Sequence, residues 1–148
     1  ETTKLRLQSG SKKMATRSLV RFAKREEGVS FSEHPERVEV QVYKHYDGYP
    51  SGHPVELAEF LECFKIVNGI PFNEDNSRMA NGLGCLAAQY IAAFKMVPGD
   101  LYVENPDTEH GDLNYITYVW VSIFDTYSDE CIFVGKPQEL IDKYEYDD

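Results

Sequence analysis

The sequence lacks any apolar run long enough to cross a membrane. Its longest apolar stretches, such as YITYVWVSIF at 115–124, are far shorter than the roughly 20 residues that a spanning helix needs. No segment has the charged, apolar and small-residue regions of a signal peptide either. The sequence therefore predicts a soluble, cytoplasmic protein without a membrane partner.

Cysteine is also scarce. The three residues Cys63, Cys85 and Cys131 are odd in number, widely spaced and without a CxxC pair. This pattern predicts neither a disulfide framework nor a zinc knuckle. All three have apolar neighbours, so we expect them to be small core residues and not reactive thiols.

Clusters of basic residues with interleaved aromatic side chains are missing as well. The chain has 15 Lys and Arg residues against 25 Asp and Glu residues, a formal net charge of −10, which repels nucleic-acid phosphates. Direct binding of DNA or RNA is therefore not expected. An acidic surface can stay solvated, meet a basic protein partner or imitate nucleic acid, and the sequence leaves these alternatives open.

The first 13 residues, ETTKLRLQSGSKK, differ from the rest of the chain. They are polar and aperiodic, with four basic residues against one acidic residue, whereas Met14 begins a patterned segment. We interpret 1–13 as an added leader and 14–148 as a single globular domain of ordinary size. Without the leader's net charge of +3, the formal charge of −10 becomes −13 for the domain.

Alternating side chains predict the strands. RSLVRFA at 17–23 and RVEVQVYKHY at 37–46 have the period of half-buried strands. LYVE at 101–104 has the composition of a strand. CIFV at 131–134 is expected to form a hairpin with the strand that precedes it in the sequence. The run LNYITYVWVSIF at 113–124 is apolar on both faces, which predicts one strand in the centre of the sheet. A further short strand can form at Val29–Phe31.

Apolar residues at three- and four-residue steps predict helices over 54–67 and 77–97. Gly82 and Gly84 in the second helix suggest a close approach by another backbone or a bent first turn. A short C-terminal helix begins at Pro137. This order of elements predicts an α+β fold: an antiparallel or mixed β-sheet with two main helices on one face, and the C-terminal helix.

The densest polar stretch, HYDGYPSGH at 45–53, lies where the second predicted strand meets the first helix. Such a junction needs turn residues for the backbone alone. The turn residues are Gly48, Tyr49, Pro50 and Gly52. The glycines can take positive φ, Tyr49–Pro50 is typical of an extended or turn dipeptide, and Ser51 or His53 can cap the helix. The helix dipole disfavours protonated His53 and leaves it a free lone pair.

The turn does not require His45 and Asp47, which lie two residues apart on the polar side of the strand. A second polar group, EHGD at 109–112, precedes the long apolar strand. We therefore define a candidate polar cluster from both stretches and the first strand. Its members are Arg17, His45, Asp47, His110 and Asp112. In contrast, His34, which precedes Pro35 in an acidic loop, is expected to be solvated.

Three interpretations of this cluster stay open. His and Asp bind divalent metals or act as general acid and base. Alternatively, Arg17 or Arg21 pairs with Asp47 or Asp112 in a structural cluster, or the residues form a recognition surface. Because no HExxH, GxSxG or P-loop is present, the sequence identifies no reaction, catalytic residue, metal or cofactor.

Three stretches together resemble a known family. They are M-A-T-R at 14–17, Y-K-H-Y-D-G-Y-P-S-G at 43–52 and H-G-D-L-N-Y-I-T-Y at 110–118. They resemble a family of small phage, bacterial and archaeal proteins with a Met-x-Thr-Arg start, a Tyr-x-His-x-Asp-Gly-Tyr-Pro-x-Gly motif and a later His-Gly-Asp. This resemblance implies a phage or prokaryotic setting, with the host cytoplasm as location if the protein is phage-encoded, and implies no reaction. His53 and the acidic end after 124 depart from the family pattern.

We expect a small acidic accessory protein that acts by binding another protein. One alternative is a metal-dependent hydrolase or small-ligand binder built from the HYDGYPSGH and HGD stretches. Another alternative is a nucleic-acid mimic, which needs carboxylates in rows at phosphate spacing. A homo-oligomer is possible, because a strand such as 131–134 can pair with a second copy at a sheet edge.

Overall fold

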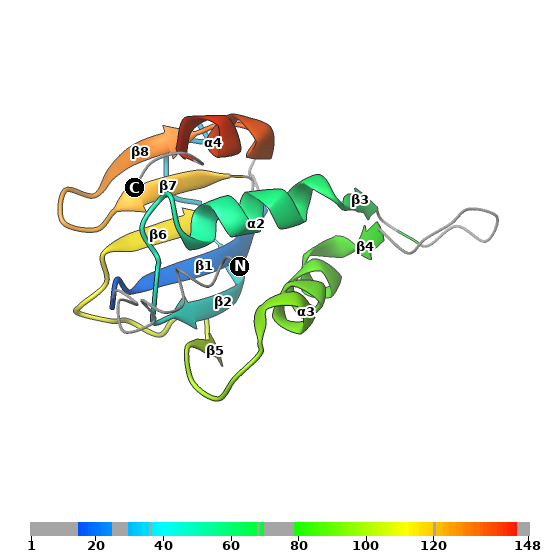
Figure 1. The fold of residues 1–148 in the computed structure, drawn as a ribbon, viewed down its shortest axis with the longest axis horizontal. Helices are drawn as coiled ribbons and strands as arrows, with labels where there is room; N and C mark the ends of the chain where they lie inside the picture. Colours follow the sequence, from blue (N-terminus) through cyan, green and yellow to red (C-terminus); the bar gives the residue numbers. More distant parts are fainter. Residues whose placement is uncertain are drawn as a thin grey trace, which may run out of the picture.

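The structure is a computed structural model that describes residues 15–24, 30–35, 37–67, 69, 79–119 and 121–144. The predicted leader and Met14 lie outside the described residues. The elements in chain order are β1 (Ser18–Ala23), β2 (Val38–Lys44), α2 (His53–Glu62), β3 (Lys65–Val67), β4 (Met79–Asn81), α3 (Gly82–Phe94), β5 (Leu101–Glu104), β6 (Tyr115–Tyr118), β7 (Ser122–Asp125), β8 (Glu130–Val134) and α4 (Pro137–Tyr144). They form an α+β fold with a short C-terminal helix, which confirms the predicted class (Figure 1).

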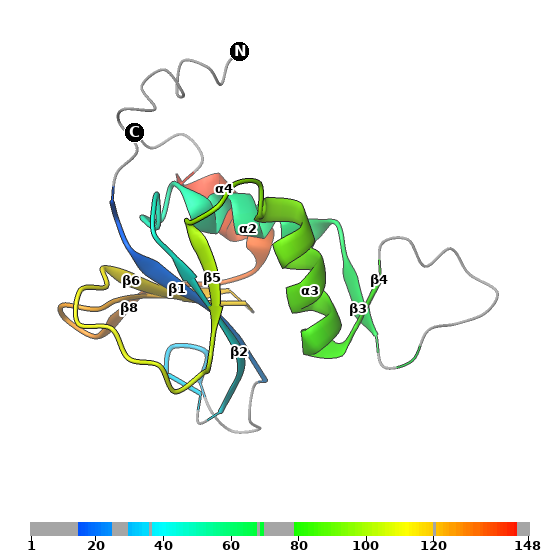
Figure 2. The same ribbon diagram turned by 90° about the horizontal axis from the view of Figure 1, so that it is seen from below.

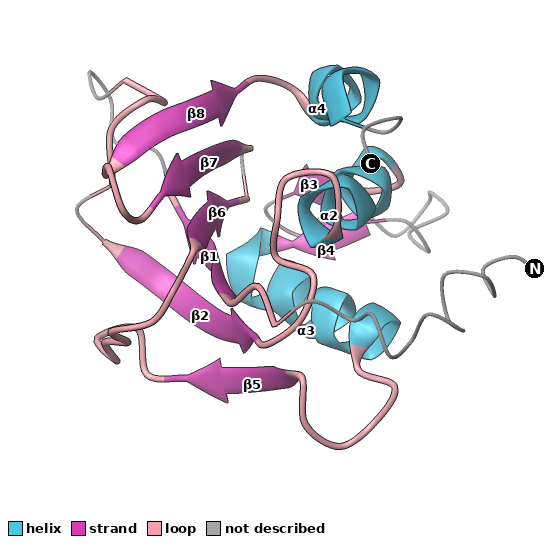
Figure 3. Ribbon diagram, turned by 60° about the vertical axis from the view of Figure 1, so that its left-hand side comes forward, coloured by secondary structure: helices cyan, strands magenta, loops and turns pink. Residues whose placement is uncertain are grey.

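One mixed sheet organises the fold. Its six strands are ordered β5-β2-β1-β6-β7-β8, as Figure 3 shows. The β1–β6 pair is parallel and the other pairs are antiparallel. Strand β1 is therefore central, and it is buried on both faces, since Leu19 and Val20 are both buried. The prediction of a half-buried strand was wrong here, because the strand's central place in the sheet and the packing on both of its faces cannot be inferred from its own alternation.

The helices lie on one side of this sheet (Figure 2). Val20, Phe22 and Val42 pack against α2 and α3, while Ile123 packs in a second cluster with α2 and α4. Because side chains alternate along a strand, the neighbouring Leu19 and Arg21 point away from the helices. We call the helix-covered side the helix face and the other side the distal face.

The first predicted helix is shorter than its apolar pattern indicates. Helix α2 ends at Glu62, and Lys65–Val67 forms β3, which pairs in parallel with β4 and projects from the main sheet in Figure 1. The prediction of a helix through Val67 was wrong because Phe64 and Val67 continue a helical spacing by chance. The β-branched residues Ile66 and Val67 suit the extended pairing.

The second predicted helix begins later than expected. Met79–Asn81 is strand β4, α3 begins at Gly82, and residues 77 and 78 lie outside the described residues. A Cβ added at Gly82 or Gly84 would meet no atom within 4 Å, so no backbone of the described residues approaches them as closely as was expected. Instead, Gly82 has φ +82 at the point where the chain turns from strand into helix, a conformation that glycine adopts without strain.

The long apolar run at 113–124 is a hairpin and not one strand. Strands β6 and β7 pair antiparallel, with Tyr118 opposite Ser122. Val119 and Val121 at the turn are buried, and the connection contains no glycine or proline to reveal it. The β7–β8 hairpin and the start of α4 at Pro137 were predicted correctly. Phe31 lies in a turn and not in an extra strand, and Val29 is outside the described residues.

Candidate functional site

The HYDGYPSGH stretch joins β2 to α2, and its glycines are required for space. A Cβ at Gly48 would clash with the Ser18 side chain, and one at Gly52 would lie 2.5 Å from the Asp47 carbonyl oxygen. The predicted positive φ occurs at neither glycine but at Asp47, with φ 59. Asp tolerates this left-handed conformation better than most residues. The Gly52 N–H donates to the Tyr49 carbonyl at 2.8 Å, so Tyr49–Pro50 forms the expected turn.

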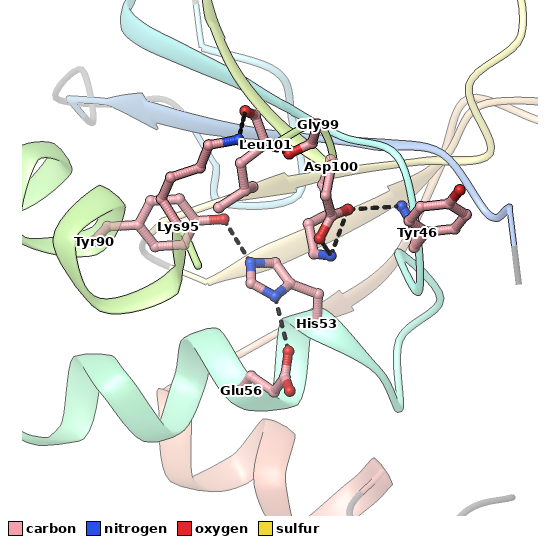
Figure 4. Close-up of polar contacts among 9 residues, drawn as sticks. Tyr46, His53, Glu56, Tyr90, Lys95, Gly99, Asp100 and Leu101 are labelled. Carbon is pink, nitrogen blue, oxygen red and sulfur yellow. Dashed lines mark hydrogen bonds and ion pairs between the residues drawn. The ribbon is translucent and has the colours of Figure 1, made fainter. Parts of the chain in front are cut away.

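His53 begins α2 and does not cap it, since the N-cap is Gly52 and no side chain bonds the cap. Its ring is 1% exposed. Nδ1 lies 2.9 Å from Glu56 Oε1 and Nε2 lies 2.5 Å from the Tyr90 hydroxyl. Figure 4 draws both contacts. Burial lowers the pKa of His53 and raises that of Tyr90.

These contacts fix the tautomer of His53. A neutral imidazole has one donor and one acceptor, and the carboxylate of Glu56 can only accept. Nδ1–H therefore donates to Glu56, and Nε2 accepts the hydroxyl proton of Tyr90. The expectation of a free lone pair on His53 was wrong, because a buried partner from α3 occupies it.

A buried ion pair lies beside His53 (Figure 4). Lys44 Nζ is 2.9 and 2.7 Å from the two carboxylate oxygens of Asp100, and the Tyr46 N–H donates to the same carboxylate at 3.1 Å. Burial alone would raise the pKa of Asp100, but the hydrogen bond and charge of Lys44 lower it overall. These contacts join the β2–α2 turn to the α3–β5 connection, which supports a structural role for the turn.

A cavity of about 340 Å³ adjoins this cluster. Asp47, His53 and Asp100 line it together with the end of α3. Lys95, also in its wall, donates to the carbonyl oxygens of Gly99 at 2.6 Å and Leu101 at 3.1 Å. The two cations of this cavity, Lys44 and Lys95, are thus bonded within the chain.

The remaining members of the candidate polar cluster make contacts around Tyr43 and Asp112. Arg17 Nε is 3.3 Å from Asp112 Oδ2, one of the pairs that the structural interpretation anticipates. His110 stacks on the ring of Tyr43 with centroids 4.7 Å apart, and its Nε2 is 2.9 Å from the carboxylate oxygens of Glu104. His45 Nδ1 is 3.0 Å from the Tyr43 hydroxyl.

The contacts of the cluster involve two groups of partners. Tyr43 stands between His45 and His110, while Asp47 lines the cavity beside His53. Within the described ranges, no group of three or more His, Cys, Asp or Glu side chains lies close enough together to hold a metal ion.

A chain of polar contacts crosses the distal face, and most of it was not foreseen. Arg21 Nε donates to Gln41 at 2.9 Å and Nη1 to the Tyr118 hydroxyl at 3.0 Å. Gln41 then donates to Glu104 at 3.0 Å, and Glu104 contacts His110. The alternation along β2 places Gln41 on its polar side, so this residue could be anticipated. Tyr118 could not, because it lies 97 residues from Arg21 in the sequence.

His34 extends this chain, so its predicted solvation was wrong. Its ring stacks on Phe124 with centroids 3.9 Å apart. Nδ1 is 2.8 Å from the Tyr118 hydroxyl and Nε2 is 2.9 Å from Asp129. These partners are 84 and 95 residues away along the chain, and no local pattern reveals them.

The distal face also carries a cavity of about 390 Å³. Its floor includes Leu19, Arg21 and Ile116, and its walls come from residues 108–111, Leu113, residues 126–127 and Asp129. The Thr126 side chain donates to the Leu113 carbonyl, which ties the two walls together. His110 and Gly111 of the HGD motif line this cavity. Asp112, the third residue of the motif, does not line the cavity and pairs with Arg17.

Exposed apolar side chains gather around β5. The exposed large apolar residues of the described chain are Phe31, Ile66, Met96, Val97, Tyr102, Val103, Tyr127 and Val134. Half of them lie between 96 and 103. Strand β5 is at one end of the sheet order, and β2 is its partner.

The cysteines differ from their predicted burial. Cys85 and Cys131 are partly buried, but Cys63 is exposed at the end of α2, where the expectation of a core residue was wrong. All three are free thiols, and burial raises the pKa of Cys131.

No protein-family model, no curated protein and no solved structure matches this chain. Among the described residues, no helix has the length and apolar character needed to span a membrane.

Proposed function

We propose that this chain is an accessory protein that binds a basic, extended segment of a partner protein along the outer edge of β5. The observation that carries the proposal is the group of exposed apolar side chains at 96–103 beside this strand. The phage or prokaryotic setting is part of the same proposal and rests on the resemblance of the three sequence motifs.

The outer edge of β5 has the properties of a strand-addition site. Among the described strands, β5 pairs with β2 alone. The backbone of Leu101 at its start is bonded within the chain, to the Gly99 carbonyl and to Lys95, so the groups left for a partner strand are those around Val103. Tyr102 and Val103 point to opposite faces and are 51% and 65% exposed. A partner strand could bond the backbone and contact both side chains.

The chain segment before β5 enlarges this surface. Met96 and Val97 are 76% and 52% exposed. Natural sheet edges are often protected by lysine, but the ammonium group of Lys95 is turned onto the backbone carbonyls of Gly99 and Leu101. The edge therefore presents mainly apolar side chains, which favour protein contacts when they are contiguous.

The net charge favours a basic partner over a second copy of this chain. The formal charge is −10, so self-association would bring two strongly acidic molecules together, while a basic segment would be attracted. We therefore expect the affinity and the association rate to fall as ionic strength rises.

Site-specific photo-crosslinking tests this proposal. A photoreactive residue is placed at Val103 and, as a matched control, at Val134, which is 44% exposed on the strand at the other end of the sheet. The protein captured at position 103 in cells of the source organism is then purified. We expect Val103→Asp to weaken its dissociation constant at least tenfold and Val134→Asp to leave it within twofold.

Equal effects of the two substitutions, or no direct binding by the purified protein, would contradict the proposed edge. Light scattering of the free chain tests whether a second copy of this chain binds at the β5 edge instead. A stable dimer that Val103→Asp converts to a monomer would assign the edge to self-association instead.

A further inference from the structure

We infer that the distal-face cavity is a binding site for a small molecule with one carboxylate group and an apolar body. At about 390 Å³, the cavity is within the range of roughly 300–1,000 Å³ that is typical of small-ligand sites. It lies over β1 and β6 and is separate from the β5 edge, so this inference does not depend on the proposed protein partner.

Arg21 is the group that would bind the carboxylate. It lines the cavity, and its guanidinium is held by Gln41 at Nε and by Tyr118 at Nη1. A guanidinium has five N–H donors in a fixed plane, and these two contacts leave further donors for a ligand. Carboxylates accept two parallel hydrogen bonds from such a group.

The orientation of Arg21 is fixed by buried neighbours. Gln41 is fully buried, and its amide nitrogen donates to Glu104 at 3.0 Å and to the Thr108 carbonyl at 3.1 Å. These bonds point its oxygen at Arg21. Since the arginine is positioned before any ligand arrives, binding costs less conformational entropy.

The charge of Arg21 has no acidic neighbour at contact distance. Throughout the part of the chain that the structure describes, no carboxylate forms an ion pair with it. By contrast, Arg17 pairs with Asp112 and the buried Lys44 pairs with Asp100. A partly buried cation without a counter-ion, in the floor of a cavity, favours an anionic ligand.

The surroundings favour a monoanion with an apolar body. Leu19 and Ile116 flank Arg21 in the floor, and Leu113 adds an apolar wall. Glu109 and Asp129 also line the cavity, and their charges repel a phosphate dianion more strongly than a carboxylate. A flat or short aliphatic carboxylate fits both features.

Nuclear magnetic resonance titration at constant ionic strength tests the inference. The probe is benzoate, compared with uncharged benzamide and with inorganic phosphate. We expect benzoate to shift the signals of Leu19 and Ile116 and to bind at least tenfold more tightly than benzamide or phosphate. Arg21→Gln should weaken benzoate binding at least tenfold, while Arg17→Gln, which removes an arginine outside the cavity, should change it less than twofold.

A second variant keeps the test decisive if Arg21→Gln unfolds. Gly111 lines the cavity, and a Cβ added there meets no atom within 4 Å, so Gly111→Phe is expected to fold and to fill the cavity while Arg21 is intact. It should also weaken benzoate binding at least tenfold. Equal binding of benzoate and benzamide, tighter binding of phosphate, unchanged binding in Gly111→Phe, or no binding of benzoate would each overturn the inference.

Discussion

The two faces of the six-stranded sheet use polar residues in opposite ways. On the helix face, the polar groups form a closed set at one end of the core, where Lys44 pairs with Asp100 and His53 bonds both Glu56 and Tyr90. On the distal face, the polar chain spreads across the strands and includes a cation without an acidic partner in the described chain, at the floor of a cavity.

The difference separates scaffold from binding surface. A buried polar set in which each group has a partner stabilises one arrangement of the chain and is costly to disturb. The HYDGYPSGH motif contributes the His53 side chain and the Tyr46 N–H to that closed set. The distal-face cavity, whose cation has no acidic partner among the described residues, is built from less conspicuous residues.

We expect the largest difference between the faces when an apolar side chain is shortened to alanine and the loss in free energy of unfolding is measured. Leu57 is fully buried between the sheet and α3, whereas Ile116 is partly buried on the distal face. We expect Leu57→Ala to lower the free energy of unfolding by about 2–5 kcal/mol. Ile116→Ala should cost less than half as much, because its surroundings include an open cavity. Urea unfolding of both variants measures this, and equal losses would remove the contrast.

The pH dependence of stability tests the closed polar set. Burial lowers the pKa of His53, so below its usual value of about 6.5 the unfolded chain binds a proton that the folded chain excludes. The stability that comes from neutral His53 is present above that pH and is lost as the pH falls through the folded pKa. His53→Gln should cost about 1–3 kcal/mol at neutral pH.

The deficit of His53→Gln should shrink as the pH falls from 7.5 to 5.5, because glutamine does not titrate. Leu57→Ala removes no titratable group and serves as the control, with the same pH slope as the parent between these values. Chemical denaturation at several pH values gives these slopes. A His53→Gln variant with the parent's slope would show that His53 does not set the acid sensitivity.

Parts of the fold were predictable wherever strong local signals frame an element. Strand β5 begins directly after Pro98, Gly99 and Asp100, and α4 begins at Pro137, so both positions were found. The end of α2 and the β6–β7 turn were missed because no strong local signal marks either boundary. Apolar residues continue through both boundaries, and local spacing cannot distinguish a pause in the helix or a buried turn from continuity.

The site was less predictable than the fold. The Arg17–Asp112 pair was foreseen as one of several options, because ion pairing needs only opposite charges and a shared edge. The contacts of His34 and Arg21 with Tyr118 join residues 84 and 97 positions apart. Contacts of this range depend on the strand order of the whole sheet, which a single sequence does not determine.

The smallest effect is expected from the Arg17–Asp112 pair. Their side chains are 32% and 61% exposed, so solvent screens the charges, and Asp112→Asn should lower stability by about 0–1 kcal/mol. Arg17→Gln and the double variant complete a mutant cycle measured by urea unfolding at low and high salt. A coupling energy above roughly 1.5 kcal/mol, beyond the usual range for exposed pairs, would mean that this pair behaves like the buried Lys44–Asp100 pair. The contrast between the two faces would then rest on Arg21 and its cavity alone.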